Sequence, residues 1–135
     1  MAVADDLAAY IEAAAARPFG WGRFDCQLFI AEWVLARTGK DPAAPWRGRY
    51  HTALGAKRIL NRHGGPLGLL ETGLGAVGLQ RTDDPQAGDV GLLRAVTANG
   101  EAACGAIRLG KRWAGLRVGG GVFVAHGDAL AAWRV

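Results

Sequence analysis

Cysteine, histidine and long apolar runs are all scarce in this chain of 135 residues. It has two cysteines and three histidines. No uninterrupted apolar segment approaches the roughly 18 residues that a membrane span needs, so we expect no membrane insertion. With so few cysteines in a chain of this size, we expect reduced thiols rather than a disulfide framework. The first residues are acidic rather than basic and include no apolar stretch, so we expect no signal peptide.

The residues that bind metal ions or nucleic acids are not clustered in the sequence. No pair of His, Cys or carboxylate residues has metal-ligand spacing, and Asp83 and Asp84 are adjacent in a turn before Pro85. We therefore expect no metal and no cofactor. The formal net charge is +4, from 16 Lys and Arg against 12 Asp and Glu. These basic residues form separate doublets rather than a run, so we expect a solvated surface and no nucleic-acid partner.

The composition is that of an ordinary globular domain, with 50% hydrophobic and 21% charged residues. The length fits a single domain over residues 1–135. Four helices are predicted in the first half, and residues 41–50 between the second and third are expected to form a loop. The helices are expected over residues 5–17, 25–39, 52–62 and roughly 66–72. Their expected N-caps are Asp5 or Asp6 for the first helix, Asp25 for the second and Thr52 for the third.

The second half changes to short segments typical of strands. Strands are expected over residues 90–96, 102–109, 113–118 and 122–125. Asn99 and Gly100 are a strong signal for a hairpin between the first two. A short helix or turn is expected over residues 128–132. Helices first and strands last predict an α+β domain, with N-terminal helices packed on a C-terminal antiparallel sheet.

Cys26 is the first candidate for chemistry. It directly follows Asp25, the expected cap, and so takes the first position of the second helix. At that position the unpaired backbone N–H groups and the helix dipole favour a thiolate over a thiol. The alternative is that Cys26 is a small buried residue at a helix start.

The segment from Pro18 to Cys26 resembles the signature of NlpC-type cell-wall cysteine peptidases. In that family an aromatic residue and a glycine pair precede an Asp-Cys dipeptide that starts the catalytic helix. Gly88-Asp89-Val90 resembles the Gly-Asp-Val that opens the family's central sheet. The resemblance covers most of the chain, from Pro18 to about Leu116. It implies a papain-like fold with Cys26 as the nucleophile.

The same resemblance leaves the catalytic triad incomplete. The family's base is a His on the strand after Gly-Asp-Val, and the corresponding stretch here places Ala103 at that position. The third polar position falls near Gly115. His126, after the last expected strand, is the remaining candidate base, and the alternative is a turn histidine exposed to solvent. We interpret His51 as a polar loop residue and His63 as a helix-end residue that complements the helix dipole.

The chain is also similar to a family of small proteins encoded among the tail genes of phages and prophages, itself similar to NlpC-type peptidases. This similarity implies a place in the virion tail tip, after synthesis in the cytoplasm of the bacterial host. It also implies other tail-tip proteins, and peptidoglycan, as partners. The stretches that carry it are Asp25-Cys26, residues 45–50 (PWRGRY), the helix ending in His63-Gly64-Gly65, Gly88-Asp89-Val90 and residues 132–135.

These observations leave two main hypotheses for the function. One is a tail-tip component with a papain-like fold and an incomplete triad, in a structural or accessory role. The other is an active cysteine peptidase or amidase that cleaves peptidoglycan peptides during infection, with Cys26 as nucleophile and His126 as base. Ala103 at the base position favours the first hypothesis. Trp46 and Tyr50 in the long loop are either a binding surface or anchors to the core.

Overall fold

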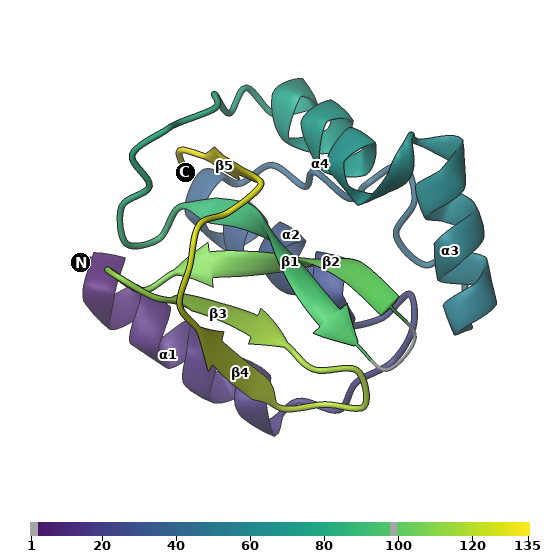
Figure 1. Ribbon diagram of the computed structural model, residues 1–135, viewed down its shortest axis with the longest axis horizontal. Coiled ribbons are helices and arrows are strands. Elements are labelled where there is room, and N and C mark those ends of the chain that lie inside the picture. The colour runs from purple at the N-terminus through teal and green to yellow at the C-terminus, as the bar shows by residue number, and fades with distance from the viewer. Residues whose placement is uncertain (1–2, 98–99) are drawn as a thin grey trace.

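The computed structural model describes residues 3–97 and 100–135. In this part of the chain four helices come first and a five-stranded sheet follows, which confirms the predicted α+β class (Figure 1). The helices are α1 (Val3–Ala16), α2 (Cys26–Thr38), α3 (Ala53–Arg62) and α4 (Gly65–Ala76). The strands are β1 (Val90–Thr97), β2 (Gly100–Arg108), β3 (Trp113–Leu116), β4 (Val122–Ala125) and β5 (Ala131–Trp133).

Local capping residues set the boundaries of α2 and α3 as predicted. Asp25 and Thr52 cap the two helices through their side chains, and Gly39 ends α2 in the left-handed region at φ 75°. The prediction for α1 was wrong in one detail. That helix already includes Val3, so Asp5 and Asp6 lie in its first turn rather than at its cap. There they still complement the positive end of the helix dipole.

The sheet is antiparallel between each pair of neighbouring strands, in the order β4-β3-β2-β1-β5. The hairpin predicted around Asn99-Gly100 has its two strands paired, because Thr97 lies opposite Gly100 and Val90 opposite Ile107. Asn99 itself lies outside the described residues. The third strand ends at Leu116, before the predicted residue 118.

The end of the chain differs from the predicted short helix or turn over residues 128–132. Residues 131–133 form β5 instead, and β5 pairs antiparallel with β1 so that Trp133 lies opposite Val90. Alanine-rich segments favour helix on local propensity, and tertiary packing overrides that preference here. All three residues of β5 are buried against β1, which supplies both the hydrogen bonds and the apolar contact.

Asp89, which precedes β1, fixes the C-terminal residues beside the sheet. Its carboxylate is 2% exposed and accepts hydrogen bonds from Arg134 Nε at 2.9 Å and from the backbone N–H of Val135 at 3.0 Å. The backbone N–H of Gln86 donates to it at 2.8 Å. Asp89 therefore holds together a turn and the chain end, and its role in this structure is architectural.

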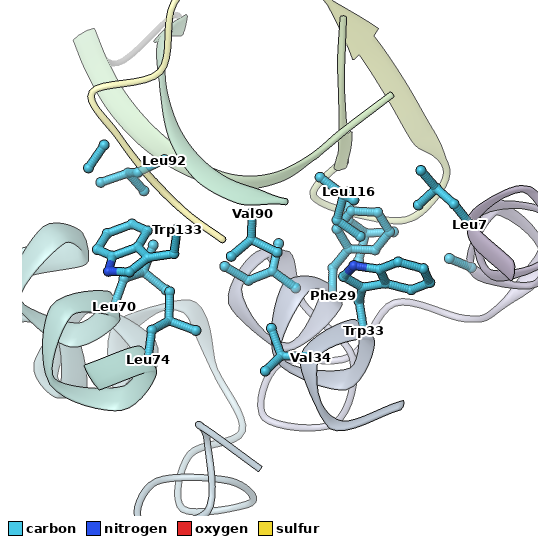
Figure 2. Close-up of a cluster of buried hydrophobic side chains, with 14 of the residues drawn as sticks. Leu7, Phe29, Trp33, Val34, Leu70, Leu74, Val90, Leu92, Leu116 and Trp133 are labelled. Carbon is cyan, nitrogen blue, oxygen red and sulfur yellow. The ribbon is translucent and has the colours of Figure 1, made fainter. Parts of the chain in front are cut away.

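The main core lies between the convex side of the curved sheet and the helices (Figure 2). α2 supplies Phe29, Trp33 and Val34 at its centre, with α1 on one side and α4 on the other. Burial of each large apolar side chain contributes about 1.5–3 kcal/mol, so this cluster anchors α2 firmly under the sheet. Across the described residues, no helix combines the length and apolar character needed to cross a membrane.

Candidate functional site

The start of α2 is organised by a buried carboxylate. Asp25 is 2% exposed, and its Oδ1 accepts hydrogen bonds from the backbone N–H groups of Gln27 and Leu28 at 3.2 and 3.1 Å. These bonds satisfy two of the N–H groups that a helix start leaves unpaired. Cys26 is therefore the first residue of α2, as the sequence predicted.

The other carboxylate oxygen of Asp25 ties two loops to the same helix start. Oδ2 accepts hydrogen bonds from the backbone N–H of Gly22 at 3.0 Å and from the Tyr50 hydroxyl. Gly22 has φ 80°, and a Cβ there would lie 2.0 Å from the Tyr50 carbonyl oxygen, so only glycine fits. Burial, together with the Asp25 hydrogen bond, raises the pKa of Tyr50, which keeps the hydroxyl protonated and donating.

The Cys26 thiol lies half-buried between α2 and the end of β3. Its Sγ donates a hydrogen bond to the carbonyl oxygen of Leu116 at 3.5 Å. The pKa of Cys26 is lowered, chiefly because the thiol of Cys104 donates a hydrogen bond to it and in small part because a backbone group does. Burial and the charge of Asp25 act in the opposite direction. Cys26 is therefore the more acidic of the two thiols, and the more readily ionised.

Cys104, on β2, is the immediate chemical partner of Cys26. It is buried, and its Sγ also lies 3.3 Å from the carbonyl oxygen of Gly105. The pKa of Cys104 is raised, first by its hydrogen bond to Cys26 and then by burial and the charge of the Cys26 thiolate. Both thiols are free. The site thus contains one thiol whose pKa is lowered and one whose pKa is raised, and both line the same pocket.

Helix α2 and strand β2 approach each other closely at Gly105, next to Cys104. A Cβ on Gly105 would lie 3.1 Å from both the Cys26 carbonyl oxygen and Gln27 Oε1, and 3.0 Å from Ile30 Cδ1. Glycine at this position therefore sets the spacing between helix and strand. Gln27 Oε1 is buried here with no hydrogen-bond partner in the described structure, which costs about 1–3 kcal/mol.

Both cysteines line a pocket of about 380 Å³, a volume within the usual range for small-molecule sites. The lining is mostly apolar and aromatic, with contributions from α2, α3, the 41–50 loop and the sheet. It comprises Trp21, Asp25, Cys26, Gln27, Trp46, Tyr50, Ala56, Ile59, Leu60, Leu69, Ala103, Cys104, Leu116, Arg117, Val118 and Phe123. A molecule with an apolar body can therefore reach the Cys26 thiol.

The aromatic residues of the 41–50 loop serve both roles considered for them. Trp46 and Tyr50 are each 6% exposed and pack in a second apolar cluster with Leu28 and Ile59. They also line the pocket. The loop is thus anchored to the core and forms one wall of the site.

The structure does not bring any histidine to Cys26. Among the described residues that line the pocket there is no imidazole. His126 follows Ala125, which lies opposite Trp113, whereas Leu116, beside Cys26, lies opposite Val122. His126 is therefore four residues beyond the Cys26 end of β4, roughly 13 Å at 3.3 Å per residue. It is exposed, as the turn interpretation holds.

The other two histidines also lie where the sequence analysis placed them. His51 is exposed just before the cap of α3, and His63 is the residue that ends α3. Ala103, by contrast, does line the pocket. The position matched to the family's base is therefore at the site, and it carries a methyl group.

Sequence reasoning named Cys26, Asp25 and Ala103 but missed the role of Cys104. One signal was available, since Cys104 directly follows the residue aligned with the missing base. Metal binding finds no support in the described part of the chain, where no three His, Cys, Asp or Glu side chains gather as a metal site requires.

Comparison with known proteins adds one finding. A family model described as a domain of unknown function (DUF6950) matches residues 1–135, and the chain belongs to this family. No curated protein and no solved structure matches the chain.

Proposed function

We propose that this protein is a tail-tip component of a phage or phage-like particle, with a papain-like fold of the NlpC type. In this proposal its role is structural or accessory, and peptide-bond cleavage is lost. The observation that carries the proposal is the content of the pocket. A cysteine starts the central helix and faces a strand of an antiparallel sheet, and Ala103 stands on that strand where the family's base is expected.

The chemical reason is that no histidine side chain is among the described residues that line the pocket beside the thiol. Acyl transfer from an amide needs a base to activate the nucleophile and an acid to protonate the leaving amine. General acid–base assistance contributes typically about 10²–10⁴-fold to such rates. Cys104 cannot supply this assistance near neutral pH, because its pKa is raised well above that range. The Cys26 thiol is thus reactive without being equipped to cleave peptide bonds.

The alternative of an active peptidase with Cys26 and His126 is the weaker proposal. For His126 to reach Cys26, either β4 would have to shift along β3, or the segment after Ala125 would have to fold back along most of β4. Trp113 Nε1 donates to the carbonyl oxygen of Gly127 at 3.2 Å, which holds that segment at the far end. The proposed partners remain other tail-tip proteins and peptidoglycan, bound rather than cleaved.

The test is turnover of purified peptidoglycan by the wild-type protein and by Cys26→Ala and His126→Ala. We expect the wild-type protein to release no more peptides or free amines from peptidoglycan than Cys26→Ala does. Turnover abolished by both substitutions would establish a Cys–His enzyme and contradict the proposal. In parallel, mass spectrometry of purified particles from the encoding bacterium should detect the chain; its exclusion from particles would contradict the tail-tip role.

Ala103→His tests the papain-like interpretation of the site independently. An imidazole introduced beside Cys26 should make the rate of Cys26 alkylation depend on a group that titrates near the ordinary histidine pKa of about 6.5. Arg94→His is the matched control, because Arg94 pairs with Ala103 across the hairpin but does not line this pocket. An equal effect of both variants, or no effect of Ala103→His, would contradict the interpretation.

A further inference from the structure

The Cys26–Cys104 pair has properties that peptide-bond cleavage does not use. The two thiols line one pocket, each affects the pKa of the other, and they are the only cysteines of the chain. They differ in exposure as well, since Cys26 is half-buried and Cys104 is buried. A more exposed thiol with a buried thiol behind it is the usual arrangement of an attacking and a resolving cysteine.

The backbone geometry brings the helix and the strand that carry the two residues into contact. The carbonyl oxygen of Cys26 lies 3.1 Å from the place of a Cβ on Gly105, the residue next to Cys104. Helix α2 and strand β2 therefore approach at the level of their main chains. Successive side chains of a strand point to opposite faces, so the Cys104 side chain leaves β2 on the face opposite to this contact. The Cys26 and Cys104 sulfurs can therefore meet only at the pocket that both residues line.

The lining of the pocket sets the class of reaction partner. At about 380 Å³ the pocket is far larger than hydrogen peroxide requires, since one water occupies about 30 Å³ of liquid. Aromatic and aliphatic side chains from Trp21, Trp46, Ile59 and Phe123 surround the space beside Cys26. An oxidant with an apolar organic group gains contact energy here that a small polar oxidant does not.

We propose that Cys26 and Cys104 form a redox-active thiol pair that reduces organic hydroperoxides with an apolar substituent. In the first step the Cys26 thiolate attacks the terminal oxygen of the hydroperoxide. The S–O bond forms and the O–O bond breaks. The substituent leaves as an alkoxide, which takes a proton from water to become the alcohol. Cys26 is oxidised to the sulfenic acid, and the hydroperoxide is reduced by two electrons.

In the second step Cys104 resolves the sulfenic acid. The Cys104 sulfur attacks the Cys26 sulfur, the S–S bond forms, and the S–O bond breaks. Oxidation of Cys26 removes the thiolate whose hydrogen bond and charge raise the pKa of Cys104 in the reduced protein, so Cys104 can then give up its proton. The hydroxide leaves with that proton as water. An external dithiol then reduces the disulfide, returning one proton to each cysteine and completing the cycle. This inference does not depend on the tail-tip role, because neither the peptidoglycan assay nor the particle analysis reports on it.

The test is a single turnover of the reduced protein with one equivalent of cumene hydroperoxide, followed by alkylation and intact-mass measurement. We expect the wild type to form no disulfide between chains, to lose two hydrogens and to lose both alkylation sites together. Cys104→Ser keeps a hydroxyl donor but cannot form the disulfide, so its Cys26 should persist as a sulfenic acid that dimedone traps. Cys26→Ser should keep the Cys104 thiol free and alkylatable under the same treatment.

Several results would overturn the proposal. These are disulfides between two chains, wild-type Cys26 driven to sulfinic acid while Cys104 stays free, or equal thiol loss in Cys26→Ser. The substrate class has its own measurement. We expect cumene hydroperoxide to consume the thiols at least about tenfold faster than hydrogen peroxide. The reason is that its aromatic ring gains binding energy when it is buried in the apolar pocket. Equal rates would contradict the apolar specificity.

Discussion

At the scale of single residues, Asp25 determines how the candidate site is presented. One carboxylate caps α2 and accepts hydrogen bonds from Gly22 and Tyr50 in two separate loops. Its negative charge also opposes ionisation of the adjacent Cys26 thiol, an effect that the Cys104 hydrogen bond outweighs. Asp25 is thus a positioning residue that sets the geometry of the thiol beside it and opposes its ionisation.

Substitution of Asp25 by alanine should be costly for stability. Loss of an N-cap costs about 0.5–2 kcal/mol, and each buried donor left without a partner adds about 1–3 kcal/mol. We expect Asp25→Ala to lower the free energy of unfolding by about 2–4 kcal/mol in urea denaturation, the sum of these effects. Asp25→Asn keeps an oxygen acceptor, so its free energy of unfolding should lie between those of the wild type and Asp25→Ala. A loss below about 0.5 kcal/mol, typical of neutral surface changes, would contradict this role.

At the scale of elements, the contact between α2 and β2 determines how the candidate site is assembled. It depends on Gly105, where a Cβ would lie only 3.0–3.1 Å from three atoms of α2, closer than ordinary van der Waals contact. At the same contact Gln27 Oε1 is buried without a hydrogen-bond partner in the described structure, which lowers the stability of the fold. That contact holds together the helix and the strand whose cysteines line one pocket.

A methyl group at Gly105 should separate the two elements. We expect Gly105→Ala to lower the free energy of unfolding by about 1–3 kcal/mol, the usual cost of overpacking, and to weaken the thiol contact. Gly75→Ala in α4 is the matched control, since a Cβ there meets nothing within 4 Å. It should be neutral or stabilising by up to about 1 kcal/mol, because alanine favours helix over glycine. Equal effects of the two variants in thermal and urea unfolding would contradict the packing argument.

At the scale of the whole molecule, the sequence predicted features that depend on neighbours in the chain. Asp25, Gly39 and Thr52 act through bonds within a few residues, so the ends of α2 and the start of α3 were predictable. β5 was not, because its three residues become a strand only by pairing with β1, far earlier in the chain. Local propensity carries no information about such a partner.

The candidate site also has features that the sequence predicted and features that it did not. Cys26 at a helix start, and Ala103 at the expected base position, were both visible in the sequence. The partnership of Cys26 with Cys104 was not, because it arises from the packing of α2 on β2 and from the glycine between them. The distance of His126 from the thiol likewise depends on strand register. The central claim is therefore that the partner of Cys26 is a thiol rather than an imidazole.

The most direct test of that claim is the pH dependence of Cys26 alkylation in the wild type, Cys104→Ala and His126→Ala. The account predicts a wild-type midpoint below the ordinary thiol value of about 8.5, because the Cys104 hydrogen bond lowers the pKa of Cys26. Cys104→Ala should move the midpoint to higher pH, and His126→Ala should leave it unchanged. A midpoint that moves in His126→Ala and stays fixed in Cys104→Ala would contradict the account.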